Sequence, residues 1–447
     1  MSESKPRPSA TAIAIAGLIA LAVAMGIGRF AFTPILPMML HDGVVDLHAA
    51  SWLASANYLG YLAGALLCTF VPLLWPRLPR LPPIDGPTLV RTGLAATAVL
   101  TLAMALPAPA LWPVLRFLAG VASAMVFVFS SAWCLAQLAA RGQASLGGAM
   151  FAGPGAGIVA SGLLASAMVA WHWHAADAWL VFGVLACLLS APVWRVFKTA
   201  AAEGPAGVAA ATAASAAAAA AASTRASTPA SASVATPTPT LTPAGAATAP
   251  VAPEHPHAEV AALAVAYGIS GFGYIVTATF LPVIARAALP ADSPWFDLFW
   301  PIFGAGVILG ALLATRARVS GDLRLLLGAA YLVQAVGIAI GLAAPTAAGF
   351  ALGSFLLGLP FTALTYFALQ EVRRLRPRHV ASTTGLVTAI WSLGQTAGPA
   401  MVAVLLRRTT DVGAAFTLSL VIAAGALVVG GLVFFASSRL WPRHASR

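Results

Sequence analysis

The chain has 447 residues and a net charge of +11, and 60% of its residues are hydrophobic whereas only 8% are charged. Soluble domains carry about a quarter charged residues, so this composition excludes a soluble protein, and with it the nucleic-acid partner that such a charge would otherwise suggest. A transmembrane β-barrel is excluded as well, because its segments of about ten alternating polar and apolar residues are absent.

Apolar runs long enough to span a bilayer as helices, about 20 residues each, follow one another along the chain. The first six lie at residues 10–39, 49–75, 88–107, 109–140, 144–170 and 176–197. Six more lie at residues 259–289, 295–315, 323–343, 346–370, 381–406 and 412–438. These runs predict an all-α polytopic membrane protein with twelve transmembrane helices in two halves, residues 1–197 and 258–447.

The stretch between the halves, residues 198–257, is a low-complexity segment rich in Ala, Thr, Ser and Pro. It lacks the density of Leu, Ile, Val and Phe residues that a spanning helix or a packed core needs. We therefore predict a disordered linker that contributes no chemistry of its own.

Basic residues indicate the orientation of the chain, because the cytoplasmic loops of membrane proteins are enriched in Lys and Arg. With the N-terminus inside, the loop residues that fall outside the cell are Arg286, Arg407 and Arg408. Arg29 and Arg116 lie within helices, and every other Lys or Arg falls on the cytoplasmic side. We expect a protein of a bacterial inner membrane with both termini and the linker in the cytoplasm.

The two halves contain matching strings in the same order. The pairs are GYLAGALL (60–67) and GVILGALL (306–313), LP (36–37) and LP (281–282), FLAG (117–120) and FLLG (355–358), and Gly153-Pro154 and Gly398-Pro399. Each repeat holds an even number of helices, so the two copies run in the same direction across the membrane. Parallel repeats of this kind are typical of transporters whose substrate path lies between the halves.

Two motifs give the chain a resemblance to the major facilitator superfamily. In LRFLAGVASA (115–124), Arg116 is followed four residues later by Gly120, which resembles the fourth-helix pattern of that family. GPGAG (153–157) resembles the core of the fifth-helix motif that is often associated with antiporters, and the resemblance implies a conformational role for Gly153, Pro154 and Gly157.

A finer resemblance lies in the string GIGRFAFTPILP and in SWLASANYLGYLAGALL, which are similar to the YbfB/YjiJ-type subgroup of that superfamily. The family's loop motif between the second and third helices is absent, since TFVPLLWPRLPRLPPIDG stands there. The eighth-to-ninth loop, TRARVSGDLR (315–324), is closer in composition but not in spacing. The cytoplasmic charge latch that this motif supplies is therefore not expected here.

Arg29 is the most telling residue, because a cation near the middle of an apolar span costs about 2.5–3.5 kcal/mol on insertion scales. One interpretation is that it faces the central cavity and binds an anionic group, to which its planar fork is suited. The alternative is a structural Arg that pairs with carbonyls or holds the first helix against a neighbour. Pro34 bends the outer part of the same helix, as suits a gating helix.

Further polar side chains within the spans are candidates for the cavity wall. We predict that Asn57 and Tyr58 of the second helix, Tyr274 of the seventh and Gln395 of the eleventh contact the substrate. Such residues are also common in helix–helix hydrogen bonds, which is the alternative for each. For Arg116 the resemblance implies a role in coupling, and the alternative is a buried Arg that satisfies carbonyls at the cytoplasmic end of its helix.

The acidic residues all lie in loops or at helix ends in the predicted topology. Proton-coupled transporters commonly use a carboxylate or a His within the membrane, so the sequence does not indicate a coupling ion. Asp297, at the mouth of the eighth helix, is the nearest candidate for coupling, and Glu371, at the end of the tenth helix, is the next. An enzyme is not expected, since a membrane-embedded hydrolase would also need such a group.

These observations predict a secondary transporter that works by alternating access between the two halves, with a small organic anion or amphipathic compound as substrate. Export of a broader set of drugs or metabolites is the alternative within this class. A membrane sensor on the same fold is the alternative outside it, although the linker offers no folded domain. We expect a monomer in the lipid bilayer, with no cofactor, metal or nucleic-acid partner.

Overall fold

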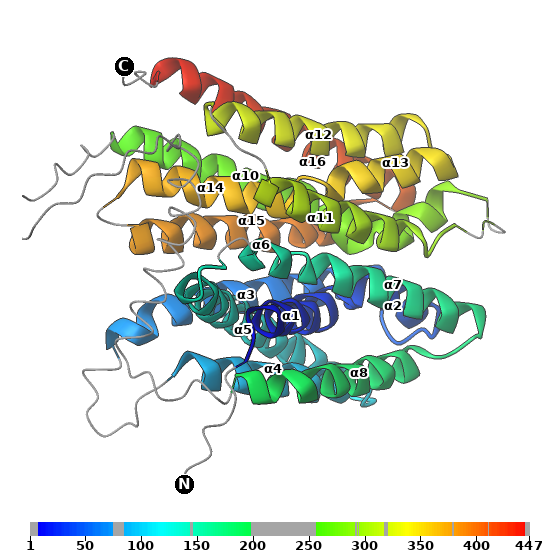
Figure 1. Ribbon diagram of the computed structural model, residues 1–447. Coiled ribbons are helices and arrows are strands. Elements are labelled where there is room, and N and C mark those ends of the chain that lie inside the picture. Colours follow the sequence, from blue (N-terminus) through cyan, green and yellow to red (C-terminus); the bar gives the residue numbers. More distant parts are fainter. Residues whose placement is uncertain are drawn as a thin grey trace, which may run out of the picture.

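The computed structural model describes residues 8–74, 85–143, 146–197, 256–290, 293, 295–316, 321–377, 380–409 and 411–442. Within these ranges the chain is helical and forms no β-strand (Figure 1). The predicted linker, residues 198–257, lies outside the described residues except for Pro256 and His257, with which the first helix of the second half begins.

The helices follow the predicted spans closely. In the first half they are α1 (Ala10–Leu21), η1 (Ala22–Phe30), α2 (Phe32–His41), α3 (Leu47–Leu74), α4 (Gly86–Ala103), η3 (Pro109–Leu111), α5 (Trp112–Ala140), α6 (Gly147–Met150), α7 (Gly153–Ala170) and α8 (Ala175–Val196). In the second half they are α10 (His257–Ala288), α11 (Phe299–Arg316), α12 (Leu323–Ala343), α13 (Ala347–Gly358), α14 (Phe361–Leu375), α15 (Val380–Arg408) and α16 (Val412–Leu440).

Ten spans in the described part of the chain are long and apolar enough to cross a membrane, and Phe299–Ala314 is a shorter apolar helix. The 18-residue α4 completes a set of twelve. The prediction of twelve helices in two six-helix repeats is therefore confirmed.

Short polar residues in the loops start several of these helices. Ser9, Asp85 and Thr346 accept hydrogen bonds from the first-turn N–H groups of α1, α4 and α13, respectively. Asp322 and Asp411 do the same for α12 and α16. A carboxylate at this position also interacts favourably with the positive end of the helix dipole, which explains why acidic residues lie in these loops.

Three predicted spans are interrupted. The first changes from α1 to the π-helix η1 at Ala22 and returns to an α-helix at Phe32. The fifth breaks between α6 and α7, just before the Gly153-Pro154 pair. The tenth breaks at Leu359 and Pro360, because proline has no N–H to donate to the preceding turn, and α14 then continues to Leu375 rather than ending near 370.

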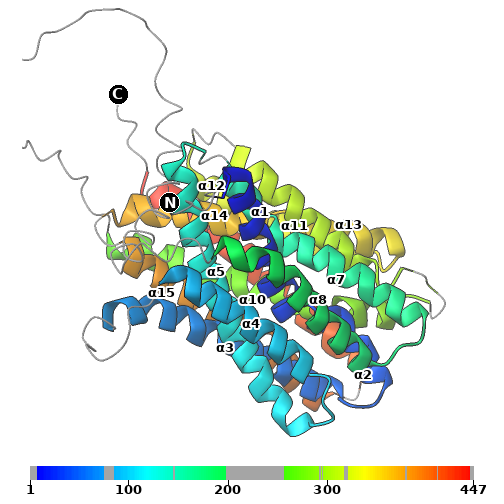
Figure 2. The same cartoon turned by 60° about the horizontal axis from the view of Figure 1, so that its bottom comes forward.

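The two halves lie as two layers of helices, one above the other in the view of Figure 1. The layers meet mainly where α3 packs against α15 and α7 packs against α11, with smaller contacts of α10 on α2 and of α11 on α6. In Figures 1 and 2 the start of α1 and the end of α16 lie at the same end of the bundle. We call this the terminal end, and the opposite one, where α2 ends and α3 begins, the distal end.

The internal repeat is visible in how glycines pack. A Cβ atom added to Gly60 of α3 would meet the carbonyl of Phe117, and one added to Gly306 of α11 would meet the carbonyl of Phe355. These four positions are equivalent in the strings GYLAGALL/GVILGALL and FLAG/FLLG. The same backbone-on-backbone crossing therefore occurs in each half, and only glycine leaves room for it.

Candidate functional site

Three arginines, Arg29, Arg116 and Arg324, are among the largest fully buried side chains of the protein. An uncompensated buried charge is expensive, so the partners of each arginine indicate what it does. Arg324 is surrounded by carboxylates, Arg116 by backbone carbonyls, and Arg29 by an amide oxygen and aromatic rings.

Arg29 lies in the last turn of the π-helix η1. Every residue of η1 is buried, so no side of this segment lies on the surface of the protein. In a π-helix the carbonyl of residue i pairs with the N–H of residue i+5, and for Arg29 that position is Pro34, which has no N–H. The sequence thus removes the π-helical hydrogen bond to the Arg29 carbonyl.

Arg116 supplies a hydrogen-bond donor at this point. Its Nη2 donates to the carbonyl oxygen of Arg29 at 3.2 Å and its Nη1 to that of Gly28 at 3.4 Å. The guanidinium also lies 4.7 Å from the centre of the Phe32 ring. These contacts are those of the alternative given for Arg116, an arginine that satisfies carbonyls. Its predicted position differs, however, because Arg116 lies in the second turn of α5, and α5 begins at the distal end rather than at the terminal end, which is the predicted cytoplasmic side.

Arg29 itself contacts the other half of the protein. Its Nη2 donates to Oε1 of Gln395 in α15 at 2.5 Å. Its Nε and Nη1 atoms are buried and have no hydrogen-bond partner. Among the described residues no carboxylate forms an ion pair with Arg29 or Arg116. The centre of the protein therefore holds positive charge without a matching acid.

Four aromatic rings enclose the guanidinium of Arg29. The centre of the Tyr61 ring lies 4.2 Å from its Cζ atom, that of Tyr58 5.0 Å, that of Phe30 5.2 Å and that of Trp391 5.9 Å. The π-faces of such rings attract a cation within about 6 Å. They offset part of the cost of burying Arg29, but they do not neutralise its charge.

Hydrogen bonds from Tyr58 and Thr33 also join the halves around this point, and one from Gln395 extends the contact of Arg29 within the second half. Gln395 Nε2 donates to the hydroxyl of Tyr274, so this amide connects Arg29 to α10. The Tyr58 hydroxyl bonds Thr279 Oγ1 at 2.9 Å, and since Thr279 donates to a backbone carbonyl, Tyr58 is the donor. Thr33 Oγ1 donates to the carbonyl of Ala278 at 2.9 Å.

Asn57 lies away from this cluster of contacts. Its Nδ2 donates to the carbonyl of Arg116 at 2.9 Å, so it joins α3 to α5 within one half. Gly120 lies beside it, because a Cβ atom there would meet the Asn57 carbonyl. The structure thus brings together Arg29, Tyr58, Tyr274 and Gln395 of the predicted contact residues, but places Asn57 in a helix–helix hydrogen bond.

The GPGAG motif packs on both sides of α7. A Cβ atom on Gly153 would meet the carbonyl of Leu18 and one on Gly157 would meet Gly26, both in the same half. A Cβ atom on Gly155 would instead lie 2.8 Å from the carbonyl of Gly304 in α11. Pro154 lies in the first turn of α7, where its missing N–H costs nothing. This motif therefore brings the first span and the second half within backbone contact of one helix.

Asp297, the predicted coupling residue, forms its ion pair with Arg286 and not with Arg29. Its Oδ1 accepts a hydrogen bond from Nη2 of Arg286 at 2.5 Å, and both side chains are about one-fifth exposed. Asp297 precedes α11 and Arg286 lies in the last turn of α10, so the pair joins two neighbouring helices of the second half at the distal end.

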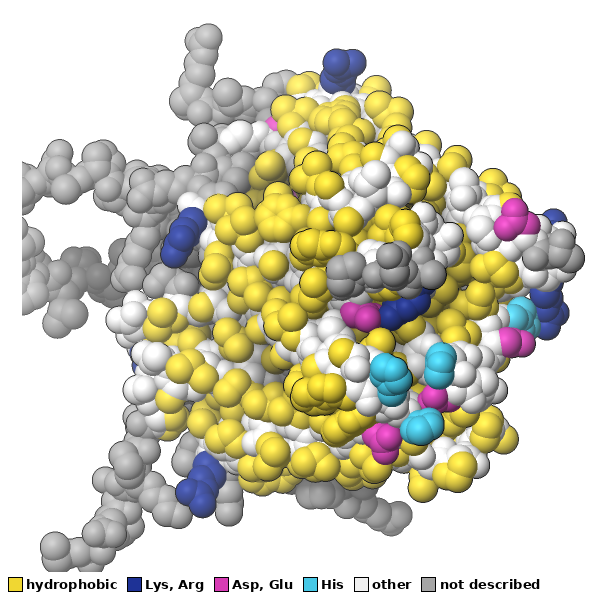
Figure 3. Space-filling view, turned by 90° about the vertical axis from the view of Figure 1, so that its right-hand side faces the viewer, with side chains coloured by type: hydrophobic (Ala, Val, Ile, Leu, Met, Phe, Trp, Pro, Cys, Tyr) yellow, Lys and Arg dark blue, Asp and Glu magenta, His cyan; other side chains and the backbone are white. Residues whose placement is uncertain are grey.

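Figure 3 looks onto the distal end, where hydrophobic side chains cover much of the face and histidine and acidic side chains gather on one side. His41 lies beside Asp42, and His174 beside Asp177. Arg407 Nε of α15 donates to His48 Nε2 of α3 at 2.6 Å. The two halves are thus joined at this end as well as around Arg29.

A buried ion cluster lies in the second half, and the sequence interpretation missed it. Arg324 pairs with Glu259 at 2.9 Å and with Asp322 at 2.7 Å, and Arg374 pairs with both Glu259 and Glu371. The two glutamates are almost fully buried within α10 and α14. The sequence predicts Glu259 as an ordinary helix-end acid and Glu371 as a second candidate for coupling, but at these ends the helices pack together and enclose both side chains. Asp322 and Arg324 belong to the stretch TRARVSGDLR, so this loop does supply charges, within one half.

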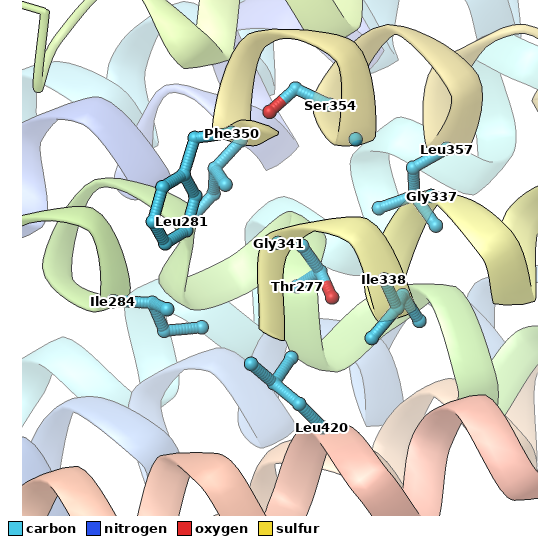
Figure 4. Close-up of a pocket in the computed structure, with 11 residues that line it drawn as sticks. Thr277, Leu281, Ile284, Gly337, Ile338, Gly341, Phe350, Ser354, Leu357 and Leu420 are labelled. Carbon is cyan, nitrogen blue, oxygen red and sulfur yellow. The ribbon is translucent and has the colours of Figure 1, made fainter. Parts of the chain in front are cut away.

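A cavity of about 20 Å³ lies between α10, α12, α13 and α16 (Figure 4). Leu281, Ile338 and Phe350 are among its lining residues, and two buried hydroxyls, Thr277 Oγ1 and Ser354 Oγ, face no hydrogen-bond partner there. A space of this size holds about one water molecule. It is too small for an organic substrate.

Sequence reasoning did not identify two aromatic residues near the site. Phe30 follows Arg29 directly, and Phe361 begins α14, with a ring centre 4.9 Å from that of Tyr274. Neither carries a polar group, and phenylalanine is common in the chain. The one available signal is that Phe30 adjoins the intramembrane arginine.

The sequence model of the family described as "Uncharacterised MFS-type transporter YbfB" matches residues 21–226 and 232–435 of the chain. No curated protein matches it. The crystal structure of the nucleoside transporter NupG superposes with a TM-score of 0.63 and 13% identity, covering 96% of this chain and 98% of that chain. A mutant of NupG gives a TM-score of 0.64 with 13% identity, over 95% and 99% of the two chains. At this identity the likeness to NupG shows the fold alone.

Proposed function

The chain belongs to the YbfB-type family of major facilitator superfamily transporters, and from this premise we propose that it moves a small organic anion, which Arg29 binds between the two halves. The observation that supports this proposal is the buried guanidinium of Arg29, whose Nε and Nη1 atoms have no hydrogen-bond partner and which has no acidic partner among the described residues. An arginine binds a carboxylate or phosphate through two parallel hydrogen bonds, which come from Nη2 together with either Nε or Nη1.

The position of Arg29 suits alternating access. Its hydrogen bond to Gln395 joins the first half to the second. An anion that takes the place of the Gln395 oxygen would keep the arginine satisfied while this bond between the halves breaks. Binding is then coupled to the relative movement of the halves, as a ligand must be that shifts a conformational equilibrium.

The proposal is tested with the purified protein in a thermal-shift and vesicle-flux screen against organic anions, neutral sugars and cationic drugs. We expect anions to raise the melting temperature and to be transported, and Arg29→Gln to abolish both effects. Arg439→Gln, a change at an exposed basic residue, is the control and should leave both intact. Stabilisation by neutral or cationic compounds alone, with transport retained in Arg29→Gln, would overturn the proposal.

Export of a broader set of drugs or metabolites is the second candidate. The contact that favours it is that of Gly155 with Gly304, because it places the antiporter-like GPGAG motif at the boundary between the halves. Transport of chemically unrelated cationic drugs in the same screen would support this candidate. A role of Asp297 in proton coupling stays a prediction, and Asp297→Asn should then remove any pH dependence of transport.

A further inference from the structure

The aromatic side chains around Arg29 continue into the second half as a stack. The ring of Trp391 lies between those of Tyr267 and Tyr274, at centre distances of 5.8 and 6.0 Å and with both interplanar angles at 17°. Phe361 meets the Tyr274 ring edge-on at 4.9 Å. Three spans of one half, which contain α10, α14 and α15, thus contribute to one aromatic wall.

Other ring contacts cross from one half to the other. Tyr61 meets Trp391 at 6.4 Å, and Phe30 meets both Phe361 at 6.2 Å and Trp300 at 6.1 Å. Separation of the halves breaks these contacts, whereas the stack around Trp391 belongs to one half and stays together. The movement that frees Arg29 from Gln395 therefore also exposes aromatic surface beside it.

Few polar side chains lie around Arg29, and most of them already form hydrogen bonds within the protein. The hydroxyls of Tyr58 and Tyr267 donate to Thr279 and Thr365. The Tyr274 hydroxyl accepts from Gln395 and keeps its own proton to donate. Together with the unpartnered Nε and Nη1 atoms of Arg29, this leaves donors for one anionic group.

We propose that the transported anion is an aromatic monocarboxylate, an inference that rests on the proposed function. Its carboxylate binds the Arg29 fork and the Tyr274 hydroxyl, and its ring packs among the rings of Trp391, Tyr61 and Phe30. Aromatic rings prefer offset or edge-on neighbours at centre distances of 4.5–7 Å, which are the spacings found here. A sugar or a dicarboxylate would instead bury several hydroxyls or a second charge among these rings, at a cost in desolvation.

The test measures dissociation constants by titration calorimetry of the purified full-length protein with three probes of similar size. Benzoate has both the charge and the ring, cyclohexanecarboxylate keeps the charge without a π-face, and benzamide keeps the ring without the charge. We expect benzoate to bind roughly 2–10 times more tightly than cyclohexanecarboxylate, from the usual strength of aromatic pairs. Benzamide should bind at least about tenfold more weakly than benzoate, because it lacks the charge that strengthens the hydrogen bonds to Arg29.

The outcomes separate this inference from the proposed function. If benzoate and cyclohexanecarboxylate bind equally and both require Arg29, or if only aliphatic anions bind, the aromatic inference is wrong and the anion proposal stands. If benzamide binds as tightly as benzoate, the anion proposal itself fails.

Substitution of Trp391 gives an independent check. Trp391→Leu should narrow the preference for benzoate over cyclohexanecarboxylate, and Trp391→Phe, which keeps a ring and guards against a folding defect, should retain most of it. Trp295→Leu, at a tryptophan that is 45% exposed in the loop before α11, is the matched control. An unchanged preference in Trp391→Leu would contradict the proposed ring contact.

Discussion

Replacement of Arg324 by methionine tests whether the buried ion cluster stabilises the second half. Arg324 donates to Glu259, to Asp322 and to the carbonyls of Ser437 and Trp441, so it connects the starts of α10 and α12 to the end of α16. Removal of one partner from a buried ion pair costs about 3–5 kcal/mol. Because Glu259 keeps Arg374 as a partner, we expect the lower value, about 3 kcal/mol.

A loss of this size is measurable by thermal unfolding in detergent. Domains of 150–250 residues lose roughly 2–4 °C per kcal/mol, so Arg324→Met should lower the melting temperature by about 6–12 °C. Arg439→Met, at an exposed position near the end of α16, is the control and should change it by less than about 2 °C, as an exposed substitution costs at most about 0.5 kcal/mol. Equal melting temperatures for the two variants would refute the reasoning.

Three further substitutions test the packing between helices. Gly120→Ala places a methyl group against a carbonyl of α3 and should cost about 1–3 kcal/mol in unfolding experiments, whereas Gly425→Ala, with nothing within 4 Å, should be close to neutral. Gly155→Val should slow vesicle transport, since its side chain keeps α7 from α11; an unchanged rate would contradict the contact. Arg116→Leu removes the donor to the carbonyls of Gly28 and Arg29, so hydrogen exchange in η1 should accelerate, and unchanged protection would contradict a role of Arg116 in holding this segment.

Much of the fold could be predicted because each span carries its own signal. A run of about 20 apolar residues spans a bilayer wherever it occurs, and the boundaries differ from the observed helices by a few residues. The interruptions were harder to predict. The segment AVAMGIGRF is buried on every side, so no apolar face reveals its π-helical turn, and only the later Pro34 hints at a break in the backbone pairing.

The site was predictable in its parts but not in its pairing. An arginine within a span is recognisable in the sequence because a charged side chain is costly to place in the membrane. Gln395 and Tyr274 are recognisable as polar residues within spans. Their hydrogen bonds join residues 366 and 121 positions apart in the sequence, and no local pattern encodes such a distance. The same holds for Glu259 and Arg324, which each look like an ordinary charge at a helix end until the helices pack.

The ion cluster makes the two halves mechanically unequal. In the second half, salt bridges cross-link α10, α12 and α14 at the terminal end, whereas the described residues of the first half contain no arginine–carboxylate pair. The first half instead contains η1, whose backbone pairing departs from that of an α-helix beside Arg29. We therefore expect the second half to move as a nearly rigid body during transport, and the bending of helices in each transport cycle to occur mainly in the first half.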